Sequence, residues 1–480
     1  MTWASFGILL YVVILVAVCM VIIFETNSSN KSLAYLLFCL FIPVAGIVFY
    51  CTFGINYWRK RRYSKKLLTC SNMLHGVREE LQQFMNTAGK KNVSFEQNEE
   101  LANMLLNDLG SPLTGNNKVQ LLINGERKFP EMHRAINEAK HHIHIEYYIY
   151  EYDTTGSELI ELLIKKAREG VEVRFVYDDF GSPSIKKKLE KRMREAGIEI
   201  YPFYKVRFYI LANRINYRNH RKIVVIDGHT AFVGGINVSD RYVNNNASKL
   251  YWRDTHVRID GPAVFYLQYL FLEDWSFCCG KALPGGGQYF NNLKSGDGNS
   301  YVQVAAGGPD SVNPSVLYSI LQTIYLAQEE ILISTPYFIP GDSILDALSV
   351  AALSGLKVKL LVPGISDSRI VNAAARSYYA KLLETGVEIY LYKKGFIHAK
   401  TMVADGKLSV VGTANMDYRS FELNFEVNAV IYDTAFAAEM RNVFFEDIKH
   451  AEKIDKQQWL ARPYYVQLPE KLARLFSPVL

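Results

Sequence analysis

The chain is poor in cysteine, and the few cysteines that it has are not spaced as metal ligands. Only six occur among 480 residues, and three of them lie in apolar runs before residue 56. A free thiol in such a run behaves as a small hydrophobic group. The other three, Cys70, Cys278 and Cys279, do not follow a zinc-binding pattern. We therefore expect no disulfide framework, no metal site and no other cofactor.

Neither positive nor negative charge is present in large excess. The chain has 54 lysines and arginines against 48 acidic residues, a net charge of +6, and no long basic stripe. Nucleic-acid binding usually requires such a stripe or patch, so nucleic acid is not an expected partner. With 49% hydrophobic and 21% charged residues, intrinsic disorder is excluded. A chain of this length predicts two or more domains.

Two long runs near the N-terminus contain no charged residue at all. Residues 3–24 and 33–55 are 22 and 23 residues long, and each exceeds the roughly 20 residues that span a bilayer as a helix. A cleaved signal peptide would begin with basic residues and have a shorter apolar run. The sequence therefore predicts a transmembrane hairpin of two helices within residues 1–58.

The basic residues nearest these runs predict their orientation. Six lysines and arginines lie within residues 59–66, whereas the loop between the runs holds only Lys31. The positive-inside rule places the N-terminus and everything after residue 59 in the cytoplasm. The basic cluster can act as a topology signal alone or can also attract anionic lipid headgroups, and the sequence is compatible with both alternatives. We expect residues 59–114 to be a basic flank followed by a helical connector.

From residue 115 onward, β-rich runs alternate with helical runs, and the pattern occurs twice. The predicted strand–helix–strand units are 143–150, 157–170 and 171–178, and then 331–338, 343–355 and 356–363. This order implies a mixed or parallel sheet. The sequence thus predicts an α/β fold of two similar domains, residues 115–290 and 291–480, with helices flanking the sheets. The C-terminal stretch 469–476 is expected to be a short helix, for which packing on the second domain is favoured over contact with the membrane.

The two halves share a motif of 19 residues. NHRKIVVIDGHTAFVGGIN (219–237) and IHAKTMVADGKLSVVGTAN (397–415) are identical at eight positions. The shared polar residues are His220 and His398, Lys222 and Lys400, Asp227 and Asp405, and Asn237 and Asn415. A duplicated cluster of imidazole, ammonium and carboxylate groups indicates chemistry on an anion.

Each motif reads as a strand that ends in a turn. With a period of two, the histidine and the lysine of one motif point to the same face of one strand. Asp-Gly then follows, between two β-rich runs, and this pair is typical of a hairpin turn. Asp227 and Asp405 are therefore candidates both for catalytic support and for a purely structural role.

One motif offers half a site, and an approximate two-fold axis between the domains would bring both halves to one pocket. Lysine and asparagine side chains can bind the non-bridging oxygens of a phosphodiester. One neutral imidazole can attack phosphorus, and the other, protonated, can donate to the departing alkoxide. Each histidine needs an orienting carboxylate, and we predict Asp254 for His220 and Glu426 for His398. Asp367 and Arg376 are candidates for the pocket entrance.

The paired HxKx4D motifs, their following GG-N and GT-N, and the run NMDYRSFELNFE resemble the phospholipase D superfamily. Within it, the chain resembles the bacterial cardiolipin synthases over nearly all of its length, including YWRDTHVRIDGPAV, STPYFIP and the ending SPVL. The resemblance implies two phospholipase D-like domains and a multi-pass protein of the bacterial cell membrane. It also implies transfer of phosphatidyl between two phosphatidylglycerol molecules, giving cardiolipin and glycerol through a phosphatidyl-histidine.

The same resemblance makes His220 the nucleophile and His398 the acid and base, although the near-symmetric motifs leave this order open. A phospholipase D-type hydrolase or another head-group phosphatidyltransferase would use the same histidines and differ only in the acceptor. A non-catalytic membrane scaffold is disfavoured because both motifs are intact, and a nuclease because no basic stripe is present. An oligomer is compatible with the sequence and is not specified by it.

Overall fold

The computed structural model describes residues 3–26, 29–53, 97–203, 217–244, 250–281, 286–290 and 297–477. Contacts divide the chain into two compact units. Residues 1–72 belong to a smaller N-terminal unit together with 206–217, and residues 73–205 and 218–480 form the large unit.

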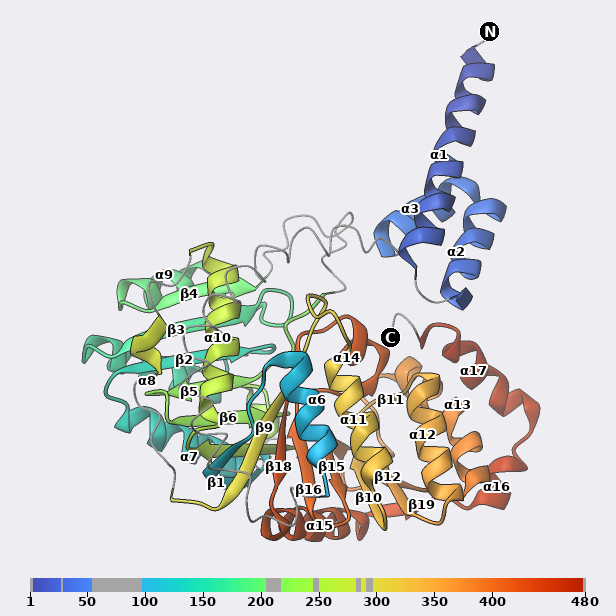
Figure 1. The fold of residues 1–480 in the computed structure, drawn as a ribbon. Coiled ribbons are helices and arrows are strands. Elements are labelled where there is room, and N and C mark those ends of the chain that lie inside the picture. Colours follow the sequence, from blue (N-terminus) through green and yellow to red (C-terminus); the bar gives the residue numbers. More distant parts are fainter. Residues whose placement is uncertain are drawn as a thin grey trace. The chain divides into compact units, whose positions relative to one another are not determined.

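Among its described residues, the N-terminal unit contains three helices, α1 (Trp3–Glu25), α2 (Ser29–Phe41) and α3 (Pro43–Phe53) (Figure 1). Among the described residues, α1 is the one helix long and apolar enough to cross a membrane, with a mean hydropathy of 3.2 over Ser5–Glu25. The first predicted membrane helix is therefore supported.

The second predicted membrane helix is wrong as a single span over its described part, residues 33–53. Proline lacks an N–H and disrupts a helix interior, and the run is divided at Pro43 into α2 and α3. The ring centroids of Phe38 and Phe49 lie 5.2 Å apart, and those of Tyr35 and Tyr50 lie 5.3 Å apart. These contacts require α3 to fold back along α2. Residues 54–58 and the basic cluster at 59–66 lie outside the described residues.

In the part of the chain that the structure describes, the large unit is built on one sheet of fifteen strands. Strands of the first half are β1 (Thr114–Ile123), β2 (His142–Tyr147), β3 (Glu172–Asp178), β4 (Glu199–Phe203), β5 (Ile223–Ile226), β6 (Thr230–Gly234) and β8 (Thr255–Asp260). Strands of the second half are β9 (Ser300–Gly307), β10 (Glu330–Ser334), β12 (Lys357–Pro363), β13 (Glu388–Tyr392), β15 (Thr401–Ala404), β16 (Leu408–Gly412), β18 (Glu426–Tyr432) and β19 (Ala451–Lys453).

Strand order shows the duplication directly. The first half runs β4-β3-β2-β5-β6-β8-β1 and the second runs β13-β12-β10-β15-β16-β18-β9, with β19 added at the edge. In each half the first three strands are parallel and the rest are antiparallel. The halves meet where β1 pairs antiparallel with β9, so an approximate two-fold axis passes between these strands. The predicted pseudo-symmetric pair of mixed α/β domains is confirmed, whereas the boundaries at residues 58, 114 and 290 stay predictions.

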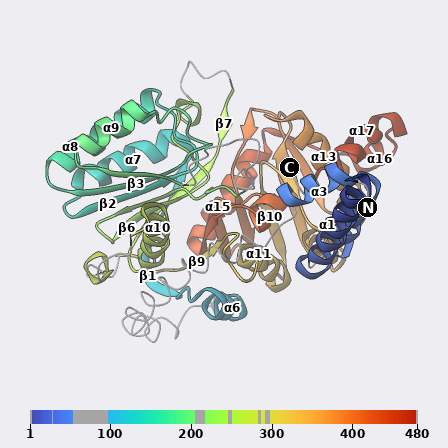
Figure 2. The same cartoon turned by 90° about the horizontal axis from the view of Figure 1, so that it is seen from above.

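Helices cover both faces of the sheet. In the first half, α7 (Asn124–Glu138), α8 (Thr154–Arg168) and α9 (Lys187–Glu195) lie on one face and α10 (Val264–Cys279) on the other (Figure 2). The second half has α11 (Ser315–Leu326), α12 (Asp342–Leu353), α13 (Arg369–Thr385), α15 (Thr434–Ile448), α16 (Lys456–Leu460) and α17 (Tyr464–Arg474). The predicted helices at 157–170 and 343–355 correspond to α8 and α12. Helix α6 (Glu99–Leu109), in the predicted connector, packs into the core of the second half through Leu101 and Leu105.

Each half encloses its own hydrophobic core. Ile145, Phe175 and Phe232 lie in the first core, and Ile333, Leu360 and Val410 lie in the second. All residues of β2 and β10 are buried, as expected for strands covered on both faces. These rigid sheets hold the ends of their strands in fixed positions, and that is where the duplicated motifs lie.

Candidate active site

The histidine and lysine of each motif precede a strand rather than lying within it. Strand β5 begins at Ile223 and β15 at Thr401, so the prediction that these residues belong to the strand is wrong. Their segments pair instead with the opposite half. The His220 backbone N–H donates to the Phe425 carbonyl at 3.0 Å, and the His398 N–H donates to the Arg253 carbonyl at 2.7 Å. Backbone pairing of this kind fixes each imidazole at the junction of the halves.

Next to His398, two short strands make the same crossing. β7 (Trp252–Arg253), of the first half, pairs in parallel with β14 (Phe396–Ile397), of the second. Next to His220, an isolated bridge joins Asn219 to Phe425. Each motif histidine is therefore brought beside the carboxylate that follows the paired segment of the other half.

The carboxylates are paired across the halves, and the predicted pairing is wrong. His220 Nδ1 lies 2.9 Å from both carboxylate oxygens of Glu426. His398 Nδ1 lies 2.6 Å from Asp254 Oδ2. Each histidine contacts the carboxylate of the other half rather than that of its own half, because pattern along a chain does not report which segments cross the two-fold axis.

One of the differences between the motifs, Gly235 in the first against Thr413 in the second, matches the different lengths of the two carboxylate side chains. A Cβ atom at Gly235 would lie 2.1 Å from Asp254 Oδ1, so any side chain there would displace that carboxylate. The equivalent Thr413 instead donates its hydroxyl to Glu426, which also accepts from Asn424 Nδ2 at 3.3 Å. The hydroxyl thus gives Glu426 a partner that Asp254 does not have.

Both motif lysines are buried and turn back toward their own histidines. Lys222 Nζ donates to the His220 carbonyl at 2.8 Å, and Lys400 Nζ donates to the His398 carbonyl at 2.5 Å. Burial lowers the pKa of Lys222 to about 7 and that of Lys400 to about 8, against the opposing pull of Asp254 and Glu426. Because these pKa values lie close to neutral pH, an anion that binds beside either ammonium raises its pKa and keeps it charged.

Burial also governs the two imidazoles. It lowers the pKa of His220 to about 4 and that of His398 to about 3, although Glu426 and Asp254 raise them. The pKa values of both carboxyls are lowered, because the facing imidazoles and lysines outweigh the effect of burial. At neutral pH the site therefore holds two neutral imidazoles and two carboxylates.

Asp227 and Asp405 lie at hairpin turns, as the Asp-Gly pairs predicted. Each aspartate and its following glycine has a positive φ, 51° and 67° in the first turn and 52° and 60° in the second, which is the pattern of a type I′ hairpin. The Asp227 carboxylate accepts from the backbone N–H groups of residues 140, 141 and 142 at 2.8–2.9 Å. Asp405 does the same with residues 328, 329 and 330. This geometry favours the structural alternative.

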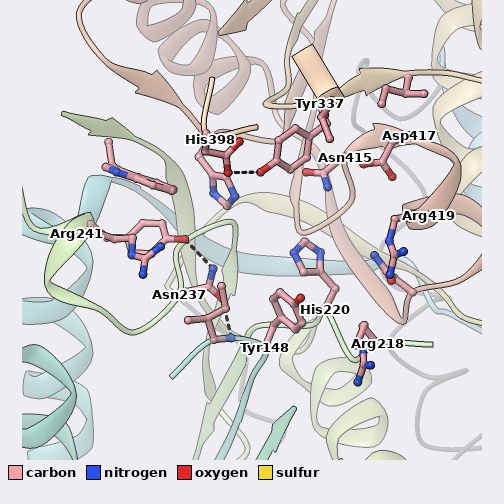
Figure 3. A pocket seen from close by; sticks show the side chains of 17 residues that line it. Tyr148, Arg218, His220, Asn237, Arg241, Tyr337, His398, Asn415, Asp417 and Arg419 are labelled. Atoms are coloured by element: carbon pink, nitrogen blue, oxygen red, sulfur yellow. Dashed lines mark hydrogen bonds between the residues drawn. The ribbon is translucent and has the colours of Figure 1, made fainter. Parts of the chain in front are cut away.

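Both histidines open into one cavity of about 350 Å³, with Asn237 and Asn415 in its wall. Figure 3 shows the two imidazoles projecting into it from the two halves. Asn237 donates to the Tyr242 hydroxyl at 2.7 Å and accepts from the Ile149 N–H at 3.2 Å. The side-chain oxygen of Asn415 is buried without a hydrogen-bond partner among the described residues. The lysines and the two turn aspartates are not among the lining residues.

Three arginines that the sequence did not predict line the cavity: Arg218, Arg241 and Arg419. Two of them could have been found from the sequence, because the internal repeat extends beyond the motif asparagine. Arg241 follows Asn237 by four residues, and Arg419 follows Asn415 by four. Asp367 also lines the cavity and accepts from the Tyr337 hydroxyl at 2.6 Å. Arg376, predicted for the entrance, binds Glu470 of α17 instead.

The site contains no arrangement typical of a metal centre. Within the described ranges, no group of three or more histidine, cysteine or acidic side chains is placed to hold an ion. The cavity wall instead combines two imidazoles with three arginines, while the two carboxylates and the two buried lysines contact the motif histidines without lining the cavity. Such a site can bind a phosphate group, supply a nucleophile and transfer a proton.

Comparisons with known proteins agree with this geometry. A family model described as cardiolipin synthase, PLD-like domain, matches twice, at residues 132–260 and 320–448. The cardiolipin synthase of Geobacillus kaustophilus is 41% identical over 463 residues, which cover 96% of this chain and 91% of that protein. The major cardiolipin synthase ClsA of Bacillus subtilis is 39% identical over the full length of both chains.

Among solved structures, the phosphatidylserine synthase of Haemophilus influenzae matches with a TM-score of 0.60 at 15% identity. It covers 79% of this chain and all of that one, and it supports the fold alone. Two matches to one domain model, together with relatives near 40% identity over nearly the whole chain, establish the family. The chain belongs to the cardiolipin synthase family of phospholipase D-like proteins.

Proposed function

We propose that the protein is a cardiolipin synthase, which transfers phosphatidyl from one phosphatidylglycerol to another and releases glycerol. The observation that carries the proposal is the crossed pair of imidazole–carboxylate contacts opening into one cavity. A transfer in two steps needs two such groups, one to form the covalent bond and one to move the proton.

In the first step, His220 Nε2 attacks phosphorus while its Nδ1–H is held by Glu426. A phosphorus–nitrogen bond forms, the bond from phosphorus to the glycerol oxygen breaks, and His398 Nε2 donates the proton that the leaving alkoxide needs. Burial lowers the pKa of His398 to about 3. His398 can therefore act as the acid only when the negative charge of the bound phosphate raises that pKa. His220 is assigned as the nucleophile by the family resemblance.

In the second step, a hydroxyl of another phosphatidylglycerol enters. His398 accepts the proton of this hydroxyl, and the hydroxyl oxygen attacks phosphorus. The bond from phosphorus to His220 breaks, giving cardiolipin and the free imidazole. Water in place of that hydroxyl would give phosphatidic acid, so the acceptor alone separates a synthase from a hydrolase.

The cationic groups are proposed to bind the phosphates. Lys222 and Lys400 stabilise the charge that develops on the transferring group, and Asn237 and Asn415 contact its oxygens. Arg241 and Arg419, which occupy equivalent positions in the two halves, bind the phosphate groups of lipid entering from either side. Asp227 and Asp405 act on structure, by holding their hairpins to the backbone of the neighbouring loop.

We further propose that α1 anchors the protein in the bacterial cell membrane and that the large unit lies on the cytoplasmic side. The support is the apolar character of α1 and the basic residues that follow the second apolar run. This arrangement would place the cavity beside its lipid substrate.

The test is turnover of labelled phosphatidylglycerol in liposomes by the full-length protein, in the presence of a chelator. We expect cardiolipin and glycerol in equal amounts, and no product from the His220→Ala or His398→Ala protein although each still inserts. Phosphatidic acid with glycerol and no cardiolipin would identify a hydrolase. Activity retained by either histidine variant would overturn the mechanism.

A further inference from the structure

Helix α17 exposes an apolar face that no other described residue covers. Seven large apolar side chains on and just after the helix are more than one-third exposed: Tyr464, Tyr465, Val466, Leu468, Leu472, Leu475 and Phe476. At about 100° per residue all of these positions except Val466 fall within one arc of roughly 120°. A stripe of this width on a globular protein usually faces a core, yet here Leu475 is 73% exposed and Leu468 56%.

The opposite face of α17 is fixed to the second half. Glu470 is buried and binds Arg376 of α13 at 2.8 Å and Arg462 at 2.9 Å. Tyr378 donates to Ser477 at 2.9 Å, and Ala473 packs against the second core. The predicted packing of this C-terminal stretch is therefore correct for one face, while the apolar face points away from the protein. The helix is held rigidly in an orientation that presents its leucines.

Charge on α17 is of one sign wherever the helix is exposed. Its single acidic residue, Glu470, is buried in the ion pairs to α13 and Arg462. Its basic residues, Lys471 and Arg474, are exposed and lie along one edge of the apolar arc. An apolar face bordered by cations complements the boundary between acyl chains and anionic headgroups.

The position of α17 relates this face to the cavity. Helix α17 lies against α13 (Figure 1), and α13 begins at the cavity, where Val371 is a lining residue. Ile370 beside it is 59% exposed, and Ile365 just before the helix is 43% exposed. Exposed apolar side chains therefore occur on α17 and also at the start of α13, which is the end of α13 that lines the cavity.

We propose that α17 is a membrane-docking helix, which inserts its leucines and aromatic rings into the surface of an anionic bilayer and holds the mouth of the cavity against it. This contact is separate from the anchoring by α1, since it belongs to the large unit. The proposal deepens the proposed function by naming the surface across which lipid reaches the site, and it rests on that function only for its kinetic test.

Photocrosslinking tests the contact without requiring turnover. Leu472→p-benzoylphenylalanine in the full-length protein, in phosphatidylglycerol vesicles, is expected to crosslink to phospholipid. Leu353→p-benzoylphenylalanine is the matched control and should give no lipid adduct, because Leu353 is 70% exposed at the C-terminal end of α12, whereas the cavity residue Ile339 precedes the N-terminal end of that helix. Crosslinks from position 472 to a second copy or to the N-terminal unit would overturn the proposal, as would no crosslink.

A kinetic test uses Leu468→Glu/Leu472→Glu/Leu475→Glu. With phosphatidylglycerol in vesicles, we expect kcat/KM to fall by about tenfold, and with a short-chain, monomeric phosphatidylglycerol it should be unchanged. Unchanged activity with the monomer also shows that the variant is folded. Equal rates for variant and wild type on vesicles would contradict docking, whereas a wild-type protein inactive on both substrates would contradict the proposed function and leave the crosslink as the test of docking.

Discussion

The two halves of the large unit share a scaffold but hold their carboxylates differently. Strand order, hairpin turns and the contacts of Asp227 and Asp405 repeat almost atom for atom. The carboxylates do not, because a glycine makes room for Asp254 where a threonine supports Glu426. The two halves therefore repeat the scaffold that holds the site, while the residues around the two imidazoles differ between them. Divergence of this kind is what two different chemical roles require.

The largest expected effect comes from filling the space at Gly235. Gly235→Ala would place a methyl group 2.1 Å from Asp254 Oδ1, move the carboxylate and leave His398 without its orienting partner. We expect kcat to fall by about 10²–10⁴-fold, measured as cardiolipin formation by protein that still inserts. Thr413→Ser, which keeps the hydroxyl at the equivalent position, is the matched control. A Gly235→Ala enzyme with full activity would show that the Asp254 contact is dispensable.

The pH dependence of kcat/KM reports the two lysines and the two histidines of the free enzyme. With pKa values of about 7 and 8, Lys222 and Lys400 lose their charge as the pH rises, so kcat/KM should begin to fall above about pH 7. With pKa values of about 4 and 3, the imidazoles stay neutral on the acid side, so no fall is expected until about pH 4. A rate measured from about pH 5 to about pH 10 that falls below pH 6.5 instead would contradict the burial of the imidazoles.

Removal of the Thr413 hydroxyl should have a smaller effect. Thr413→Val keeps the shape but leaves one oxygen of Glu426 without its donor, and a hydrogen bond to a buried charged group contributes roughly 1.5–3 kcal/mol. We expect about a tenfold loss of kcat, with KM little changed. The effect should disappear in a Glu426→Gln background, and its persistence there would mean that Thr413 acts by another route.

The turn aspartates should affect stability rather than chemistry. Asp227→Ala and Asp405→Ala each remove an acceptor from three backbone N–H groups, which we expect to cost about 1–3 kcal/mol of unfolding free energy. Because the contacts are duplicated, the two variants should be destabilised alike. Activity per folded molecule should stay within about twofold of wild type, and a hundredfold loss would restore the catalytic role.

Several features of this fold and site could be predicted from the sequence because they are local. The period of the strands, the Asp-Gly turns and the duplicated histidines, lysines and asparagines all appear in short stretches. Asp254 and Glu426 could be selected as orienting carboxylates by their place before and within paired strands. Arg241 and Arg419 were within reach, since both follow the motif asparagine by four residues.

Other features depended on contacts that a linear pattern does not contain. The carboxylates cross between the halves because backbone segments before them pair across the two-fold axis, as His220 does with Phe425. The second apolar run has enough length for a membrane helix, yet Pro43 divides it and the aromatic contacts of Tyr35 and Phe38 fold it back. The exposure of the apolar face of α17 also depends on such contacts, because amphipathic spacing does not reveal which face of a helix is covered.

The most direct test of the crossed site is to locate the covalent intermediate. Full-length protein would be incubated with labelled phosphatidylglycerol and quenched, and the modified peptide would be sequenced by mass spectrometry, in wild type, Asp254→Asn and Glu426→Gln. The account predicts phosphatidyl on His220. It also predicts that Asp254→Asn, which weakens the acid and base His398, slows both formation and loss of the adduct, whereas Glu426→Gln slows mainly its formation. An adduct on His398, or the reverse effect of the two carboxylate variants, would contradict the assignment of one role to each half.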